Sequence, residues 1–278
     1  MKLKSFLSNL PARVILLIYS VIVLYPLLWT VTTSFKTTNE FYENPWSMPK
    51  SFQWTNYINA FKEASIGSYF VNSVLVTLLS MAICMILSFM AAYVISRYDF
   101  KAFRWMKKMY LVALFFPVAF KIVPLFQLLG DMHLLDSLFG LVLAYSATTI
   151  PFTIFLMAGF LESISKEYEE AAMIDGCSRF GVLFRIIAPM ARSGMITVAI
   201  FNFMSYWNEY IMALSFITTE SKRTLTLGIA YLMEVQRYAT DWGALFAGLV
   251  IVMIPTLVLY ALLQRKITAG INVGGLKG

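Results

Sequence analysis

The chain is poor in charge and in the side chains of catalysis. Only 13% of its 278 residues are charged, against roughly 25% in soluble domains. It has one histidine, two cysteines and no stretch of the form G-x-x-x-x-G-K-[ST], which would hold the phosphates of ATP. A Ser-His-Asp triad, a carboxylate pair and metal-ligand spacing are absent from the sequence too. We therefore expect neither an enzyme nor a metal site, and no ATP or other cofactor in this chain.

Apolar residues make up 59% of the sequence and gather in long runs. A helix needs about 20 apolar residues to cross the hydrocarbon of a bilayer. Six segments are long enough: Val14–Thr33, Tyr69–Ser96, Met109–Leu129, Ser137–Leu161, Met195–Phe216 and Trp242–Leu263. The first is too long for the apolar part of a signal peptide, so it is expected to be retained. The sequence thus predicts an all-α integral membrane protein with six transmembrane helices in one domain, an N-terminal helix at 14–33 and core spans over 69–263.

The distribution of basic residues predicts the orientation. Alternate connections collect 15 of the 22 lysines and arginines, and these connections include both termini and the polar loop at 163–193. Cytoplasmic loops carry such an excess, so we expect both termini and this loop on the cytoplasmic side of the plasma membrane. The formal charge of +7 is then explained by orientation and not by nucleic acid.

Two connections are expected on the outer side. Ser34–Ser68 contains Pro45, Trp46, Pro49 and Trp54, which predicts an irregular, aromatic-anchored segment. Its aromatic residues fit interfacial anchoring and contact with an extracytoplasmic partner equally well. The second connection, Thr218–Asp241, is polar enough to hold a short surface or re-entrant helix, with the same two alternatives.

Five prolines interrupt four of the apolar segments. Each removes a backbone donor and favours a bend, and bent helices suit a bundle around a pathway better than simple anchors. The residues are Pro26, Pro117, Pro124, Pro151 and Pro255.

The polar loop at 163–193 has the signals of two short helices. Ser165 is a candidate N-cap, Glu167 and Glu169 place negative charge in the first turn, and Gly176 stands where the helix should stop. A second helix is expected from about Ser178 to Ile187, ended by Pro189.

Within this loop the spacing of Glu170-Ala171-Ala172, Gly176, Ile186 and Ala188-Pro189 resembles the EAA loop of permease subunits in bacterial ATP-binding-cassette (ABC) importers. The resemblance implies a helix-loop-helix that inserts into a cleft of a separate ATPase subunit, where ATP and magnesium would be bound. The residues that would carry the coupling are Glu170, Ala171, Ala172, Asp175, Gly176, Arg179, Ile186 and Pro189. The alternative is an ordinary amphipathic helix on the membrane surface.

The resemblance to carbohydrate importer permeases extends over nearly the whole chain. Pro117, Pro124, Pro151-Phe152, Trp207-Asn208-Glu209 and the glycine-rich end match the pattern, for which the smaller permease of the maltose transporter is typical. It implies a binding-protein-dependent permease bundle that imports a sugar or oligosaccharide. It also implies three kinds of partner: a second, homologous permease, two cytoplasmic ATPase subunits and an extracytoplasmic sugar-binding protein.

The C-terminal tail, residues 264–278, lacks an apolar period, so no packed element is expected there. The resemblance implies that this tail reaches between the ATPase subunits. Its contacting residues would be Gly274, Gly275, Lys277 and Gly278.

Two charges fall inside predicted spans, Lys121 and Glu209. Charges in the membrane are costly, so each suggests a function. One hypothesis places Glu209 on the substrate pathway, together with Asn202, Tyr206, Trp207 and Asn208. Equally, Glu209 could tie helices together in a buried network, and Lys121 could snorkel to the outer headgroups. An alternative function, an ion-coupled secondary transporter, would use Glu209 and Lys121 for ion coupling.

Overall fold

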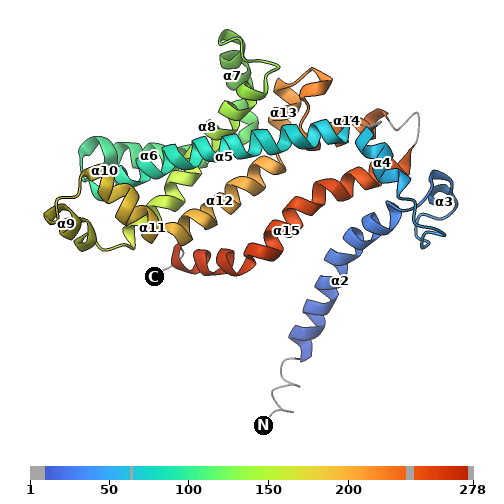
Figure 1. Cartoon of the computed structure of the whole chain (residues 1–278), viewed down its shortest axis with the longest axis horizontal. Coiled ribbons are helices and arrows are strands. Elements are labelled where there is room, and N and C mark those ends of the chain that lie inside the picture. Colours follow the sequence, from blue (N-terminus) through green and yellow to red (C-terminus); the bar gives the residue numbers. More distant parts are fainter. Residues whose placement is uncertain (1–9, 63–64, 236–240, 275–278) are drawn as a thin grey trace. The chain divides into compact units, whose positions relative to one another are not determined.

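The computed structural model describes residues 10–62, 65–235 and 241–274, and the regular secondary structure in these ranges is helical (Figure 1). By contacts the chain divides into two compact units. The smaller unit takes in the chain up to Gly67 together with Gly228–Ile254, and the larger unit takes in Ser68–Leu227 together with the residues from Pro255 onward. The single domain expected from the sequence stays a prediction.

The larger unit is built on two long apolar helices, α5 (Ile66–Arg97) and α8 (Leu138–Glu162). Small polar side chains join them: the Ser146 hydroxyl donates to the Ser80 carbonyl over 3.2 Å, and the Ser80 hydroxyl donates to the Val142 carbonyl over 3.3 Å. Small residues let apolar helices approach closely in a membrane. The other elements of this unit are α6 (Lys101–Leu114), α7 (Val118–Asp131), α9 (Glu167–Ile174), α10 (Arg179–Gly181), η1 (Val182–Ile187), α11 (Ala188–Met190), α12 (Arg192–Trp207), α13 (Ile211–Phe216) and η2 (Glu220–Lys222).

Four helices of the described chain are long and apolar enough to cross a membrane, and the number rises to at most six if each of two bent helix pairs is one span. The four are Pro11–Thr33, Ile66–Arg97, Leu138–Glu162 and Trp242–Leu262. They agree with the first, second, fourth and sixth predicted segments. The third and fifth predicted segments are not continuous helices.

The bend expected at Pro117 is confirmed, but it is so sharp that the third predicted segment, Met109–Leu129, is wrong as a single helix. In its place α6 and α7 meet at a bend of 108°. Pro117 lies at the bend as the residue before α7, with φ −57° and ψ 144°. Because the proline ring disfavours helical geometry in the preceding residue, α6 ends before Pro117 and a new helix begins after it.

The fifth predicted segment, Met195–Phe216, is also wrong as a single helix, since α12 ends at Trp207 and α13 begins at Ile211. The side-chain amide of Asn208 donates to the Met204 carbonyl over 2.8 Å and so competes with continuation of the helix. Glu209 therefore lies in a break between two helices and not within a helix.

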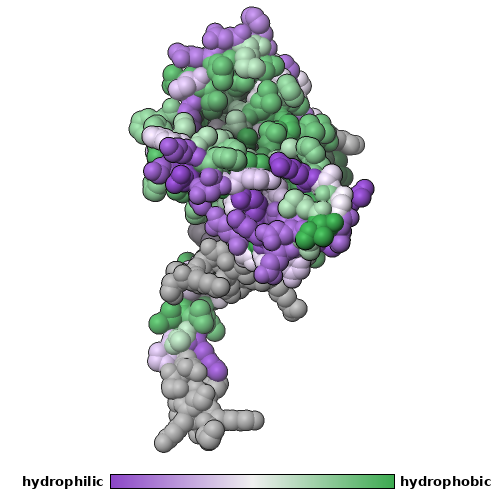
Figure 2. Space-filling model, turned by 90° about the vertical axis from the view of Figure 1, so that its left-hand side faces the viewer, coloured by the Kyte–Doolittle hydropathy of each residue, from purple (hydrophilic) through white to green (hydrophobic). Residues whose placement is uncertain are grey.

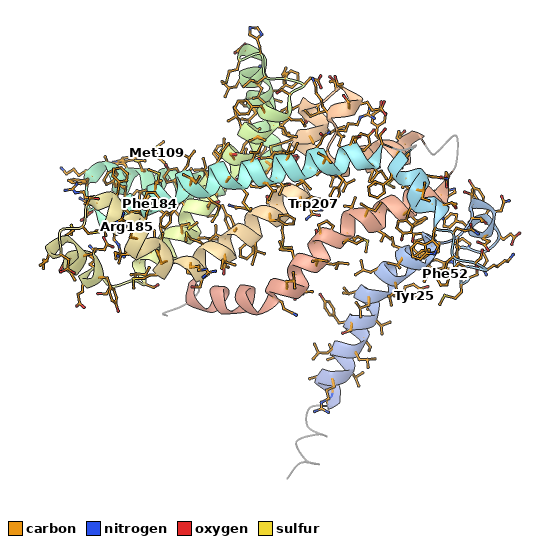
Figure 3. All side chains as sticks on the ribbon, in the orientation of Figure 1. Tyr25, Phe52, Met109, Phe184, Arg185 and Trp207 are labelled. Carbon is orange, nitrogen blue, oxygen red and sulfur yellow. The ribbon has the colours of Figure 1, made fainter. Side chains whose placement is uncertain are left out.

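The smaller unit contains α2 (Leu10–Thr33), α3 (Thr38–Glu43) and α4 (Thr55–Lys62), with parts of α14 (Leu225–Val235) and α15 (Trp242–Gly274). Aromatic rings join these elements: Trp29 meets Phe246 edge-to-face at 5.2 Å, and Phe41 stacks on Trp242 at 4.9 Å. Figure 3 labels Tyr25 and Phe52 in this unit, on α2 and in the segment between α3 and α4.

The segment 34–68, expected to be irregular, holds two short helices, whereas the short helix expected in 218–241 is confirmed by α14.

Lys36 anchors the turn after α2. Its side chain is buried, and its ammonium donates to the carbonyls of Asn44 and Pro45 over 3.2 and 2.9 Å. Burial lowers the pKa of Lys36 below its usual value. The helix that follows is fixed by a reciprocal cap, in which Thr37 and Glu40 each accept the other's backbone N–H.

The tail continues the last helix. The sequence analysis expected no packed element of its own there, and residues 264–274 extend α15 to Gly274 without forming a separate element. Extension of an existing helix needs no new nucleus, which explains why these residues follow the long apolar run into helix. Gly274 is the last residue of α15, whereas Gly275, Lys277 and Gly278 lie outside the described residues.

Asp136 holds the connection between α7 and α8 against the segment before η2. Its Oδ1 accepts the backbone N–H groups of Thr218 and Thr219 over 2.9 and 2.8 Å, and its Oδ2 accepts from Lys222 Nζ over 3.1 Å. The Thr219 hydroxyl also donates to Oδ2 and has the largest effect. Together these donors favour the ionised form and hold the pKa of Asp136 well below its usual value of 3.8.

Replacing Asp136 with asparagine is expected to destabilise the protein by about 1 kcal/mol at pH 5–8, because the ion pair and one charged acceptor are lost from a partly exposed site. A group with a lowered folded pKa stabilises above its unfolded pKa, so the difference between the protein and D136N should shrink as the pH falls below 3.8. Thermal unfolding of the detergent-purified chain at several pH values measures this. The exposed Asp131→Asn is the matched control, and an equal effect there would contradict the role of Asp136.

Candidate functional site

The polar loop between α8 and α12 begins with α9. The Ser165 hydroxyl accepts the N–H of Glu167 over 3.3 Å, so Ser165 satisfies a donor of the first turn although the residue next to the helix is Lys166. Three glutamates occupy that turn, where the helix dipole favours negative charge. Gly176 follows the helix with φ +82°, a conformation that L side chains rarely adopt, and it turns the chain toward α10.

The second half of the loop departs from the prediction at Pro189. The second helix begins near Ser178 as expected, and the Ser178 hydroxyl caps α10. The helix continues through Pro189 to Met190 instead of ending at Pro189. Pro189 lacks the N–H that would bond the carbonyl four residues earlier. The segment before it, η1, has wider, π-type turns, which accommodate the proline within a continuous helix. The N–H of Ala188 accordingly donates to the Leu183 carbonyl, five residues back.

The two faces of α9 have different surroundings. Glu169 and Ala172, three residues apart, are buried against the larger unit. Glu170 and Ala171 are exposed, as is Ile174, whose side chain is 85% exposed. Because successive helical residues are turned by about 100°, Glu169 and Ala172 lie on one side of α9, and Ala171 lies almost opposite Glu169. Ala172, expected at the partner contact, instead packs in the chain's own core with Val182 and Leu183.

A buried ion pair fixes the inner face of α9. Arg97 Nε, at the end of α5, lies 2.5 Å from Glu169 Oε1, and the two side chains are 5% and 10% exposed. Arg97 Nη2 also donates to the Ile164 carbonyl over 3.0 Å, and the Tyr93 hydroxyl donates to Glu169 Oε2 over 2.8 Å. These contacts therefore join α9 directly to the end of α5. Tyr93 and Arg97 were not among the residues expected at this site, although an arginine that ends a long apolar run is a signal for pairing with an acidic residue of a nearby polar loop.

The outer face of this loop carries apolar side chains among charged ones. Figure 2 views the end of the larger unit that bears α6, α9 and α10, and shows hydrophobic residues there within a largely hydrophilic surface. Figure 3 places Phe184 and Arg185 on η1 at this end. The exposed large apolar residues of the loop include Tyr168, Met173, Ile174, Phe180 and Phe184. We call these five residues with Glu170 and Ala171 the loop surface. Apolar side chains exposed together on a surface indicate a contact site.

The other expected coupling residues lie around the loop surface. Asp175, Gly176 and Arg179 are exposed in the turn between α9 and α10 and at the start of α10. Pro189 is exposed on α11, and Ile186 is half-buried against the core. The loop thus brings together Glu170, Ala171, Asp175, Gly176 and Arg179 on exposed backbone, while Ala172 faces inward.

Within the apolar part of the larger unit, Glu209 accepts hydrogen bonds from several elements. Its carboxylate accepts the N–H groups of Met212 and Ala213 over 2.7 and 3.1 Å, at the start of α13. The Tyr145 hydroxyl on α8 donates to the same carboxylate over 2.6 Å, and Thr226 Oγ1 donates to the Glu209 carbonyl over 2.7 Å. This is the geometry expected of a residue that ties helices together.

Most of the other residues expected on the substrate pathway also face the core. Tyr206 is buried, stacks on Tyr145 and hydrogen-bonds Thr149. Asn202 is buried and accepts from Thr153 over 3.1 Å. Trp207, labelled near the end of α12 in Figure 3, is buried, whereas Asn208 is exposed. A role for these residues in substrate passage stays a prediction.

Lys121 lies on α7 and is half-buried. In the described part of the chain it forms no ion pair with Glu209, whose carboxylate is occupied by the donors given above. The two charges proposed for ion coupling are thus not paired in this structure.

Comparison with known proteins identifies the class of molecule to which this loop and bundle belong. Residues 85–272 match the family described as the binding-protein-dependent transport system inner membrane component. The chain belongs to this family. The permease is 40% identical over 263 residues to the diacetylchitobiose uptake system permease protein NgcG of Streptomyces coelicolor, covering 95% of this chain and 87% of the relative. It is 30% identical over 255 residues to the trehalose transport system permease protein SugB of Mycobacterium tuberculosis, covering 92% and 93%.

A solved structure agrees with the fold of the permease. It is a crystal structure of a bacterial ABC transporter involved in the import of the acidic polysaccharide alginate, with a TM-score of 0.82 and 21% identity, covering 94% of this chain and 97% of that one. These findings confirm the resemblance to carbohydrate ABC importer permeases and a multi-pass protein of the plasma membrane. The named relatives are transport permeases and not enzymes.

Proposed function

We propose that this permease is one of two homologous transmembrane subunits of an ATP-driven importer for a sugar or oligosaccharide. In this proposal a sugar-binding protein delivers substrate from the outer side, and two ATPase subunits bind at the loop surface on the cytoplasmic side. The sugar class is supported by the relatives, which are named for diacetylchitobiose and trehalose. A second alginate transporter structure, solved with its periplasmic protein bound, supports the delivery partner.

The observation that carries the proposal is the two-sided construction of α9. Its outer face presents Glu170, Ala171 and Ile174, and its inner face is held to α5 by the buried Arg97–Glu169 pair. A helix of this kind can accept a partner on one side and pass its displacement to a membrane helix on the other. An ordinary amphipathic surface helix needs no such attachment to a membrane span.

The alternative of an ion-coupled transporter would require Glu209 to exchange a proton or a cation. Its carboxylate already accepts three hydrogen bonds, two of them from the backbone of α13. If Glu209 released those bonds, the backbone N–H groups in the first turn of α13 would have no acceptor. The geometry therefore favours ATP-driven transport.

Charge reversal at Glu170 tests the proposal. Glu170→Lys is expected to weaken binding of the ATPase subunit by about tenfold or more, because a charged residue at the centre of a contact is converted into a repulsive one. Gly176→Val should act in the same direction, since valine is strained at φ +82°. The measurement is co-purification of the ATPase with the permease, together with ATP-dependent sugar uptake in proteoliposomes.

The matched control is Glu43→Lys, which makes the same charge change at an exposed glutamate of α3. It should leave ATPase binding unchanged. Normal binding and coupled uptake in both loop variants would refute the docking role of the loop. Uptake that proceeds without ATP would refute the importer class as a whole.

A further inference from the structure

The helix α6 is made of basic residues and apolar residues. Its 14 residues include four basic side chains and no acidic one, and Met109 on this helix is labelled in Figure 3. Trp105 is largely exposed, and Lys108 lies over its ring at 5.9 Å. Basic helices with exposed aromatic residues are typical of the membrane interface. The basic residues are Lys101, Arg104, Lys107 and Lys108.

A polar cavity of about 250 Å³ lies between the end of α5, α6 and the end of α8. Charged side chains line it, and Arg97 among them is neutralised by the buried Glu169. Three cations and two carboxylates remain, so the cavity is positive overall. These five residues are Arg104, Lys107, Lys166, Asp99 and Glu162.

The ion pairs at this cavity are exposed to solvent. Arg104 Nε lies 3.2 Å from Asp99 Oδ1, and Lys107 Nζ lies 2.9 Å from Glu162 Oε1, but their side chains are about half exposed or more. Exposed pairs contribute little to stability, so both cations can turn to another anion. Lys166 makes no ion pair within the described ranges.

An apolar cavity of about 210 Å³ adjoins the polar one. Both are lined by Ile95, Lys107 and Glu162, and the apolar cavity continues between α6 and α8 along Leu111 and Phe155. Gly159 on α8 lines it, and a Cβ built on this glycine meets no atom within 4 Å. The two cavities together therefore have a cationic part and an apolar part that meet at Lys107.

We propose that these joined cavities bind one anionic glycerophospholipid, with its phosphate against Arg104 and Lys107 and an acyl chain between α6 and α8. Charge complementarity selects the phosphate, and the adjoining apolar cavity selects a lipid over a free anion. Each cation near a lipid phosphate favours an anionic membrane lipid by about fivefold. The site lies beside the Arg97–Glu169 pair, so the bound lipid holds α6 against the end of α8 close to the loop surface. This binding needs only the membrane-embedded chain and goes beyond the proposed transport function.

Photolabelling of the full-length permease in nanodiscs tests the site. The probes are phosphatidylglycerol and phosphatidylcholine with the same diazirine-bearing acyl chain, and labelled peptides are mapped by mass spectrometry. Phosphatidylglycerol is expected to label the facing peptides of α6 and α8 at least about fivefold more strongly than phosphatidylcholine. Equal labelling by the two lipids would overturn the proposal without any variant being needed.

Two variants locate the headgroup and the chain. The double variant R104Q/K107Q should reduce labelling by phosphatidylglycerol to the level of phosphatidylcholine, whereas Lys50→Gln, which removes an exposed paired lysine on the segment after α3, should not. Gly159→Leu should abolish labelling between α6 and α8 with both lipids because leucine fills the cavity, whereas Ala119→Leu at an exposed position of α7 should leave it unchanged.

Circular dichroism and gel filtration verify that each variant is folded. Unchanged labelling in G159L or in R104Q/K107Q would overturn the site. Competition of the lipid by inorganic phosphate would assign the polar cavity to free phosphate. This result would also overturn the proposal.

Discussion

Replacing Arg97 with alanine is expected to destabilise the permease by about 3–5 kcal/mol, because it leaves the Glu169 carboxylate buried without its cation. Both side chains are at most 10% exposed, so water cannot take over the role of the guanidinium. The carbonyl of Ile164 would lose its donor as well. Thermal or urea unfolding of the detergent-purified chain measures the loss.

A double variant separates the cost of leaving one charge buried without a partner from the role of the Arg97–Glu169 contact in transport. Arg97→Met with Glu169→Leu removes both charges, so it should recover part of the stability that either single variant loses. It should still fail in ATP-driven uptake if the pair transmits the movement of α9 to α5. The matched control is Lys50→Gln, since the Lys50–Glu43 pair is exposed and its loss should cost at most about 1 kcal/mol. Equal losses at the buried and exposed pairs would contradict the role of Arg97.

Replacing Glu209 with alanine is expected to cost about 3 kcal/mol or more. The change leaves the N–H groups of Met212 and Ala213 and the Tyr145 hydroxyl without their acceptor, and each unsatisfied buried donor costs about 1–3 kcal/mol. Glu209→Gln should lose less, because the amide oxygen can still accept from one of these groups. Thermal unfolding in detergent gives the order of the two variants.

The same variants distinguish a tie between helices from a contact with substrate. Asn208→Ala is the control, since Asn208 occupies the same break but is exposed. If Glu209 acts only as a tie, E209Q should lower stability and leave the substrate preference of uptake unchanged. Wild-type stability with an altered KM would instead place Glu209 on the substrate pathway.

The length and apolar character of the segments were enough to predict an all-helical membrane protein. The sequence signals that the structure confirms are those that depend on the conformation of a single residue. Gly176 was expected to stop a helix and adopts a positive φ, and Ser178 was expected at the start of the second helix and caps it. Such signals depend on the backbone near the residue and not on distant neighbours.

The features that could not be predicted depend on tertiary contacts. Hydropathy sums over a window, so it passed over the break at Glu209, where a few residues leave the helix without lowering the apolar average. At Pro117 the proline predicted a bend, but its local geometry did not predict that the bend would reach 108°. The sequence also gives no means of assigning Glu169 and Glu170 to opposite faces before the position of Arg97 is known. For the same reason Glu209 left two roles open until Tyr145 and the start of α13 were located beside it.

The division of labour on α9 has an evolutionary consequence. Exchange of Glu170, Ala171 or Ile174 changes only exposed side chains, whereas Glu169 and Ala172 pack against the rest of the larger unit. Under the proposed function, duplicated permeases can therefore change their ATPase partner by substitutions on the exposed side of α9. The contacts of α9 with the membrane helices remain the same.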